Sequence, residues 1–408
     1  MARRAFLLLQ GVCSPFFARL ADELQAAGHA VLKLNFNAGD ALYWARRPGW
    51  HFRGTLDELG EFLETRYARH GITDQVMFGD CRPVHRCASA CAARNGVRTH
   101  VFEEGYFRPY WITLESEGAN GRSRLPRDPG WFRHVARLLP PTPVEARFAA
   151  PYRVRAFHDV AYHVAGSLNP ILYPHYRTHS ATTAPLEYAA YVRRLAWLKL
   201  NRRREEERVR SLAESGIAYF VLALQLNGDA QVRAHSRFRD MGEVVNEVMA
   251  SFASYAPPAC HLAIKNHPLD EGHLNHGRIV RREAHGLGLG RRVHYLEAGD
   301  LATLVAHSKG LVTVNSTSGL AALEHGKPTI VLGNAIYDLP GMTAQVGLDE
   351  FWRRPQPPDP QQFESFRKVV LQLTQVNGGL YCRGGMALAA KNSCAVLIDA
   401  LPRLQRFL

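Results

Sequence analysis

Short apolar runs alternate with amphipathic segments along most of this chain, and this alternation limits the folds open to it. The first hundred residues contain, in order, AFLLLQGV, SPFFARLADELQAAGH, AVLKLNFN, DQVMFGD, RPVHRCASACAARNG and THVFEEG. The apolar runs have the length of buried strands, and the segments between them have helical periodicity. A repeated strand–helix–strand order predicts a parallel sheet with helices on its faces.

The alternation breaks off in the middle of the chain and resumes at about residue 217. The expected strands there are AYFVLALQ, HLAIKNHP, RVHYLEA, GLVTVNS and PTIVLG. We therefore expect an α/β protein with two doubly wound Rossmann-like domains facing a cleft, where ligands bind beyond the carboxyl ends of the strands. The expected division is a domain at 1–135, a helical insertion and connector at 136–205, a domain at 206–345 and a bridging helical segment at 346–408.

The charge balance indicates an anionic partner. The chain has 50 Lys and Arg against 37 Asp and Glu, a formal net charge of +13. Such an excess suits nucleic acid, an anionic membrane surface or a phosphorylated substrate, and it can also serve only to solvate the surface. The sequence contains no recognised nucleic-acid motif, so we expect no nucleic-acid partner.

The cysteines and the apolar runs indicate the compartment. The seven cysteines form no CxxC pair, which predicts neither a disulfide framework nor a zinc site and suits a reducing cytosol. No run approaches the roughly 20 apolar residues that a spanning helix needs. We therefore expect a cytoplasmic protein whose contact with a membrane is peripheral.

Two adjacent acids close one expected strand. Glu103 and Glu104 stand before Gly105 in VFEEGYFRPYW. Successive strand side chains point to opposite faces, so only one of the two can easily face the cleft. The pair is either a solvated strand end with an ordinary turn or contains a general acid or base, which requires a carboxyl whose pKa burial can raise.

Lys265 and His267 follow another strand, in IKNHPLD. Lys offers a point charge to a phosphate, and His is a donor that can also pass a proton. A His beside Pro is equally common as a plain turn residue.

A third group stands where the strand GLVTV meets a helix. Asn315, Ser316, Thr317 and Ser318 precede Gly319. The hydroxyls are expected to cap the helix, and the free backbone N–H groups would attract an anion such as phosphate. Capping alone accounts for one hydroxyl of the three.

Asp229 is the acid whose role position alone leaves open. It follows Gly228 in the stretch LALQLNGDAQVRAHS and is either a turn residue or a reacting group. Other polar or glycine positions beyond strands would line a cleft or simply form turns: Gly11, Asn37, Asp40, Asp80, Arg82 and Arg108.

The EEG, HP and STS motifs, in this order, resemble those of bacterial CMP-sugar transferases. The chain more closely resembles the KpsS/LipB-type capsular polysaccharide proteins over residues 6 to 345. The segments that carry the resemblance are FFARLADELQAAGHAVLKLNFNAGD, FGDCRPVHR, VFEEGYFRPYWITLE, GANGRSRLPRDP, LQLNGDAQVRAHS, IKNHPLD and VTVNSTSGLAALEHGKPTIVLGNAIYDLPGMT.

The resemblance implies a GT-B-like variant fold and β-Kdo glycosyltransferase activity. Members of the family transfer Kdo from CMP-Kdo to a (lyso)phosphatidylglycerol-type lipid and so start the poly-Kdo linker of a capsule. The sugar is β-configured in the donor and in the product, so the reaction retains configuration and implies a covalent intermediate on a carboxylate. The implied partners are CMP-Kdo, the lipid, the anionic inner-membrane surface and other capsule synthesis and export proteins.

The resemblance also assigns roles to residues. It makes Asp229 the nucleophile and Glu103 or Glu104 the base, with Glu103 preferred because related sialyltransferases use the first acid. The residues implied to hold CMP-Kdo are Gln225, Lys265, His267, Asn315, Ser316, Thr317 and Ser318. No cofactor is expected, and no metal either, because CMP is a monophosphate leaving group and no Asp-x-Asp cluster is present.

Two departures from the family pattern concern the acceptor side. The first loop, QGVCSPFF, lacks a Gly-Pro pair, and Ala38 stands where a Gly is usual. Two rival hypotheses remain at this point: another GT-B-type sugar-nucleotide enzyme, with a different donor or epimerase activity, and a non-catalytic basic scaffold at a membrane surface.

Overall fold

The computed structural model describes residues 3–177, 184–226, 232, 235–268, 270 and 274–408. The chain divides into two compact units. The first unit contains Met1–Leu125, Leu138–Ala181 and Lys368–Leu408, and the second contains Pro126–Arg137 and Thr182–Arg367. Each unit is described by itself.

The first unit is built on a seven-stranded sheet with the order β12-β6-β5-β4-β1-β2-β3. Its strands are β1 (Ala5–Leu8), β2 (Ala30–Asn35), β3 (Trp50–His51), β4 (Asp74–Phe78), β5 (Arg98–Glu104), β6 (Trp111–Ser116) and β12 (Gln375–Asn377). β3, β2, β1, β4 and β5 are parallel. β6 pairs antiparallel with both β5 and β12.

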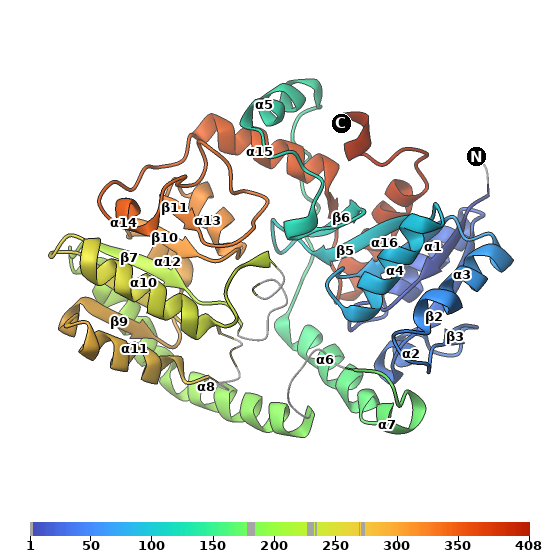
Figure 1. Ribbon diagram of the computed structural model, residues 1–408, viewed down its shortest axis with the longest axis horizontal. Coiled ribbons are helices and arrows are strands. Elements are labelled where there is room, and N and C mark those ends of the chain that lie inside the picture. Colours follow the sequence, from blue (N-terminus) through green and yellow to red (C-terminus); the bar gives the residue numbers. More distant parts are fainter. Residues whose placement is uncertain (1–2, 178–183, 227–231, 233–234, 269, 271–273) are drawn as a thin grey trace. The chain divides into compact units, whose positions relative to one another are not determined.

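Helices cover both faces of this sheet, because its strands are apolar on both sides. The main helices are α1 (Phe16–Ala26), α2 (Ala38–Trp44), α3 (Leu59–His70), α4 (Pro83–Arg94), α6 (Tyr152–Gly166), α7 (Asn169–Leu172) and α16 (Arg383–Leu397). Phe6 and Leu8 of β1 share a core with α1 and α16, which lie side by side (Figure 1). Leu7 and Leu9 share the opposite core with α3 and α4. This alternation follows from the two-residue period of a strand.

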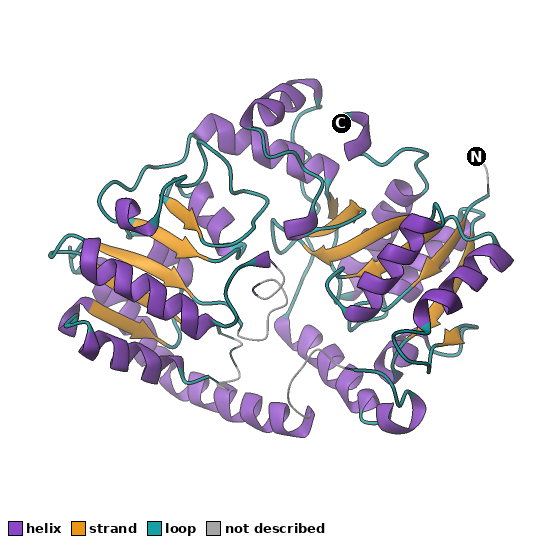
Figure 2. Cartoon of the chain, viewed as in Figure 1, coloured by secondary structure: helices purple, strands orange, loops and turns teal. Residues whose placement is uncertain are grey.

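The second unit has a five-stranded, fully parallel sheet with the order β11-β10-β7-β8-β9 (Figure 2). Its strands are β7 (Tyr219–Ala223), β8 (His261–Lys265), β9 (Val293–Leu296), β10 (Gly310–Thr313) and β11 (Thr329–Val331). Its helices are α5 (Pro129–Leu138), α8 (Ala184–Glu214), α10 (Met241–Tyr255), α11 (His276–Gly286), α12 (Leu301–Ala306), α13 (Ser318–Glu324), α14 (Leu348–Phe351) and, up to Arg367, α15 (Pro360–Leu373). Phe220 and Leu222 pack in one core and Val221 in the other, so this sheet too is buried on both faces.

The two doubly wound α/β units expected from the alternation are confirmed. The first sheet is mixed rather than purely parallel, because β6 returns directly after β5 through a turn at Gly105. A Cβ at Gly105 would lie 1.9 Å from the carbonyl oxygen of Trp111, so only glycine fits this turn.

The compact units divide the chain at other positions than the expected 135, 205 and 345. Residues 138–181 of the expected connector pack in the first unit, where α6 lies against α2. Of the segment expected to bridge the halves, Lys368–Leu408 also belongs to the first unit, because β12 pairs with β6 and α16 buries its apolar face there. Among the described residues, no helix combines the length and apolar composition needed to cross a bilayer.

Candidate active site

Each sheet has one point where the strand order reverses, and ligands of doubly wound sheets bind beyond the carboxyl ends of the strands there. In the first unit β1 lies between β2 and β4, and these strand ends lead to Gly11 and Asp80. In the second unit β7 lies between β8 and β10, and the ends lead to Gln225 and Asn315. Most of the predicted site residues therefore follow these strands or their neighbours.

Glu103 and Glu104 close β5 in the first unit and have different surroundings. Glu104 Oε1 accepts a hydrogen bond from the Tyr381 hydroxyl over 2.9 Å and lies 3.2 Å from Arg155 NH2. Burial, together with the nearby carboxylates of Asp80 and Glu104, raises the pKa of Glu103 from an ordinary 4.5 to about 7, although Arg82 opposes the shift. Glu103 is thus a carboxyl that exchanges a proton near neutral pH, as a general base must.

The carboxyl of Glu103 lies over the turn that follows β4. A Cβ at Gly79 would be 3.2 Å from Glu103 Oε1, and Gly79 has φ +75°. A glycine here therefore meets both the left-handed backbone and the close approach of the carboxyl. This contact brings Glu103 to the strand-order reversal of the first sheet.

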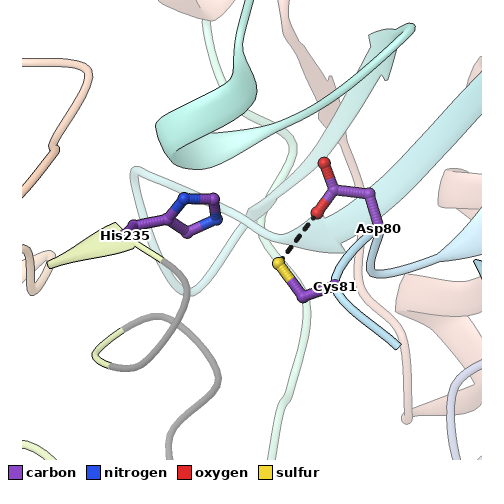
Figure 3. A group of neighbouring side chains, drawn as sticks. All are labelled: Asp80, Cys81 and His235. Carbon is purple, nitrogen blue, oxygen red and sulfur yellow. Dashed lines mark hydrogen bonds between the residues drawn. The ribbon is translucent and has the colours of Figure 1, made fainter. Parts of the chain in front are cut away.

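Asp80 is buried beside this turn and is held by the protein. Cys81 Sγ donates a hydrogen bond to Asp80 over 3.2 Å (Figure 3), and the backbone N–H of Ala119 donates over 3.4 Å. Helix α4 begins after its N-cap residue Arg82, whose side chain makes no capping bond. Arg82 NH1 instead donates to the carbonyl oxygen of Gly11 over 3.4 Å, which ties the ends of β1 and β4 together.

Asp40 and Asn37, predicted to line the acceptor side, are used in building the end of the first sheet. Asp40 Oδ2 lies 2.6 Å from Lys33 Nζ in a buried ion pair, and its Oδ1 accepts from the backbone N–H of Gly11 over 3.2 Å. Asn37 caps α2 by accepting from the Asp40 N–H over 2.9 Å. Arg108 is exposed, and its Nε donates to the Gly105 carbonyl oxygen over 3.1 Å.

Helix α6 and the segment after α7 supply side chains to this edge that sequence reasoning missed. The Tyr162 hydroxyl accepts from Gln10 Nε2 and from Asn37 Nδ2, each over 2.8 Å, and the Tyr176 hydroxyl accepts from Gln10 over 3.1 Å. Gly39 permits the contact, because a Cβ there would lie 2.7 Å from the Tyr162 ring. The aromatic and His-rich composition of residues 156–180 was the available signal.

In the second unit, Lys265 ends β8 and is buried. Its Nζ donates to the Asn266 carbonyl oxygen over 2.8 Å. Burial, with the nearby Arg194 guanidinium, lowers the pKa of Lys265 from 10.5 to about 8, against the opposing carboxylates of Glu205 and Glu297. A buried lysine of this kind is a cation that an incoming anion would stabilise.

His267 is positioned through Asn266, a residue that the motif reasoning did not single out. The backbone N–H of His267 donates to Asn266 Oδ1 over 2.8 Å. Asn266 Nδ2 donates in turn to Glu297 over 3.0 Å and to Asp270 over 3.1 Å. The amide side chain of Asn266 therefore fixes the turn that carries Lys265 and His267.

Gln225 and Asn315 join the ends of β7 and β10 at the strand-order reversal of the second sheet. Gln225 Nε2 donates to Asn315 Oδ1 over 2.9 Å, and the Asn315 backbone N–H donates to Gln225 Oε1 over 3.0 Å. The amide of Gln225 is thus engaged with the protein, and its contribution here is to hold Asn315 in place.

Of the three hydroxyl residues after Asn315, Ser316 accepts a hydrogen bond from the first N–H of α13, whereas the N-cap residue itself does not. Thr317 is the N-cap and makes no side-chain capping bond, while Ser316 Oγ accepts from the Ser318 N–H over 3.2 Å. The turn is held instead by the Tyr337 hydroxyl, which donates to the Ser316 carbonyl oxygen over 2.5 Å. A Cβ at Gly319 would lie 2.3 Å from this hydroxyl, so glycine is required.

Asp229 lies outside the described residues. Before Asp229, the structure describes the chain up to Leu226. After it, His235 and Ser236 bond with residues that follow β11. Ser236 forms an antiparallel bridge with Gly333, and the Asn334 N–H donates to the His235 carbonyl oxygen over 2.7 Å.

The chain is similar to known capsule polysaccharide proteins. The family described as "Capsule polysaccharide biosynthesis protein" matches residues 73–381. The chain is similar to the capsule polysaccharide export protein KpsS of Escherichia coli, with 36% identity over 383 residues, which cover 93% of this chain and 98% of KpsS. It is also similar to the capsule polysaccharide modification protein LipB of Neisseria meningitidis serogroup B, with 39% identity over 388 residues, 92% of this chain and 91% of LipB.

The solved structures that align with this chain have lower sequence identity to it than KpsS and LipB. KpsC, a β-Kdo 2,7 transferase of Thermosulfurimonas dismutans, aligns with a TM-score of 0.44 at 12% identity, covering 97% of this chain and 99% of that chain. The UDP-GlcNAc 2-epimerase of Neisseria meningitidis bound to UDP-GlcNAc aligns with a TM-score of 0.33 at 15% identity, covering 97% and 99%.

Proposed function

This chain belongs to the capsule polysaccharide biosynthesis protein family, and from that membership we propose that it is a glycosyltransferase of capsule synthesis. The proposed reaction is transfer of Kdo from CMP-Kdo to a (lyso)phosphatidylglycerol-type lipid with retention of the β configuration. The proposed place of work is the cytoplasmic face of the inner membrane, and the excess of positive charge would draw in the anionic donor.

The observation that carries the proposal is the state of Glu103. Its pKa of about 7 suits removal of a proton from an acceptor hydroxyl at physiological pH, whereas Glu104 is engaged by Arg155 and Tyr381. Of two adjacent acids, only Glu103 therefore combines a position at the strand-order reversal with the chemistry of a base.

The second unit supports binding of the donor. Lys265 would carry its full positive charge when the phosphate of CMP-Kdo lies beside it, because an anion raises the pKa of a buried ammonium group. His267 stands two residues further in the same turn, and Asn315 to Ser318 stand at the neighbouring strand end. These groups would stabilise the charge that develops on the departing CMP.

The reaction would run in two displacements. The Asp229 carboxylate attacks the anomeric carbon, the bond to the CMP oxygen breaks, and CMP leaves with the bonding electrons. The acceptor hydroxyl then attacks the same carbon, Glu103 takes its proton, and the carboxylate of Asp229 is released. Two inversions give net retention. We propose no metal for this route, because the leaving group is a monophosphate beside a lysine.

A transfer assay tests the activity. The purified protein is incubated with CMP-Kdo and a fluorescent lysophosphatidylglycerol, and the expected product is a lipid heavier by one Kdo residue. No adduct from correctly folded protein would contradict the proposed donor or acceptor. Formation of product from a different sugar nucleotide alone would establish the rival transferase or epimerase.

A second measurement tests the nucleophile. Intact-protein mass spectrometry with CMP-Kdo and no acceptor should detect a protein species heavier by one Kdo residue, and Asp229→Asn should abolish it. Asp240→Asn is the matched control, since Asp240 is the N-cap of α10 and should leave the adduct unchanged. An adduct that persists in Asp229→Asn would place the nucleophile elsewhere.

A further inference from the structure

Helices α6 and α7 of the first unit expose a row of large apolar side chains. Phe157, Val160 and Val164 have the spacing of one face of α6, and Leu168, the N-cap of α7, and Ile171 in α7 follow them at intervals of four and three residues. All five are exposed, Phe157 by 69% and Ile171 by 80%. We refer to these five residues as the α6–α7 face; Figure 1 shows the two helices in succession.

This row differs from the scattered apolar residues that any protein surface contains. Val144 and Leu200 are more exposed, but Val144 precedes α6 in the chain and Leu200 belongs to α8. Single exposed apolar residues are common, whereas a contiguous apolar surface marks an interaction site. The opposite side of α6 is already occupied, because Tyr162 bonds with Gln10 and Asn37.

The charges beside the face are basic. Residues 147–177 contain four arginines and a single acid, Asp159, which lies 3.7 Å from His163. Arg153 and Arg177 are exposed at the two ends of the segment. An apolar helix face with exposed arginines matches the boundary between the acyl chains and the phosphate groups of an anionic bilayer.

We propose that the α6–α7 face is a membrane-docking surface that inserts its apolar side chains into the interface of an anionic bilayer. Arg153 and Arg177 contact lipid phosphates while Phe157, Val164 and Ile171 enter the acyl region. A second copy of this chain is a poorer occupant, because a two-fold contact through this face would bring the like charges of these arginines together.

Docking in this orientation has a consequence that rests on the proposed function. Helix α6 presents Tyr162 and Arg155 to the edge that carries Gln10, Asn37 and Glu104. A bilayer bound to the outer side of α6 therefore lies next to the edge proposed to receive the acceptor. A lipid acceptor would then reach that edge without leaving the membrane.

Vesicle flotation tests the docking surface. The full-length protein should float with phosphatidylcholine vesicles that contain phosphatidylglycerol, and less with phosphatidylcholine alone. The double variant Phe157→Gln/Ile171→Gln should lower the partition coefficient roughly a hundredfold, since each apolar side chain contributes roughly tenfold. Leu200→Gln, which removes an 85% exposed leucine from α8, is the matched control and should bind as the wild type does.

The charge is tested separately. Arg153→Gln/Arg177→Gln should weaken flotation with the anionic vesicles, and added salt should weaken flotation of the wild type. Equal flotation of the wild type and the double apolar variant would overturn the proposal. So would a wild type that ignores vesicles but forms dimers that the apolar variant cannot form.

The proposed function can fail independently. With a short-chain, water-soluble acceptor, the double apolar variant should transfer Kdo at the wild-type rate, while its transfer to vesicle-bound lipid should fall together with flotation. Loss of flotation with unchanged transfer to vesicle lipid would contradict the docking role. Flotation without any transfer, by contrast, would remove the proposed function and leave the docking surface standing.

Discussion

Two adjacent carboxyls at the end of β5 show how one residue step decides chemistry. A strand turns successive side chains to opposite faces, so Glu103 meets Asp80 and the Gly79 turn while Glu104 meets Arg155 and Tyr381. Glu104 forms an ion pair with Arg155. Glu103 is half-buried beside the carboxylates of Asp80 and Glu104, and it therefore keeps its proton up to about pH 7.

The pKa values of Glu103 and Lys265, each at the end of a strand, predict a bell-shaped pH profile of kcat/KM for the proposed Kdo transfer. Activity should rise as Glu103 loses its proton near pH 7 and fall as Lys265 loses its charge above about pH 8. Glu103→Gln should lower kcat by roughly 10² to 10⁴ and remove the rise. Lys265→Arg should move the fall to higher pH. If Glu104→Gln instead removed the rise in the pH profile, Glu104 would be the base and the assignment of Glu103 would be contradicted.

Deprotonation of Glu103 should also lower the free energy of unfolding at neutral pH. The pKa of Glu103 is about 7 in the folded chain and near its ordinary 4.5 in the unfolded chain, so between these values the folded state binds more protons. Stability therefore falls as pH rises from 4.5 to 7. Glu103→Gln should raise the melting temperature at pH 8 and change it less at pH 4. A lower melting temperature at pH 8 would contradict this placement of the carboxyl.

At the scale of elements, helix α6 completes the edge of the first sheet that we propose as the acceptor side, although α6 lies outside the strand–helix alternation. It packs on α2, where Gly39 leaves room for the Tyr162 ring. The Tyr162 hydroxyl accepts hydrogen bonds from the buried side-chain amides of Gln10 and Asn37. Removing such an acceptor leaves buried donors unpaired, at about 1–3 kcal/mol each. The contact therefore holds the strand ends as well as the helix.

Gly39→Ala tests this packing. A Cβ at Gly39 would meet Tyr162 atoms at 2.7 Å, so α6 or α2 must shift, and we expect a loss of about 1–3 kcal/mol in the free energy of unfolding. Gly60→Ala in α3 is the matched control, because nothing lies within 4 Å of that position. It should stabilise the protein by about 0.5–1 kcal/mol. Urea unfolding of both variants measures the difference, and equal effects would refute the contact.

At the scale of the molecule, the N-terminal and C-terminal segments of the chain both belong to the first unit. Arg4 and Arg98 donate to the carbonyl oxygens of Leu397 and Ala400, and both pair with the buried Asp74. His100 Nε2 lies 2.8 Å from the same carboxylate. This ion cluster joins the amino ends of β1, β4 and β5 to the carboxyl end of α16.

Asp74 should make the first unit sensitive to acid. Burial opposes its ionisation, but hydrogen bonds from His100 and Arg4 prevail and hold the pKa of Asp74 far below its ordinary 3.8. Its contribution is therefore complete above about pH 4 and is lost as the pH falls further. Asp74→Asn should cost about 3–5 kcal/mol at pH 7, because Arg4 and Arg98 lose their buried counter-charge. Asp22→Asn, in an exposed pair with Arg47, should cost less than about 1 kcal/mol.

The sequence by itself determined the α/β class, the strands that precede the candidate site residues in each unit, and the motifs at the ends of these strands, including the pattern typical of the capsule family. These depend on short-range periodicity and on residue types next to a strand end, which are readable one segment at a time. The order of EEG, HP and STS along the chain needed no tertiary information.

Only the tertiary structure decided which polar groups are available for chemistry. Asp40 and Gln225 looked like ligands for a substrate, yet Lys33 and Asn315 occupy them, and Glu103 differs from Glu104 only through its neighbours. The return of β12 and α16 to the first unit, and the seat of α6 on Gly39, join segments that lie far apart in the sequence. Burial and partners that are distant in the sequence determine the pKa and the available hydrogen bonds of each side chain, and local sequence predicts neither burial nor these partners.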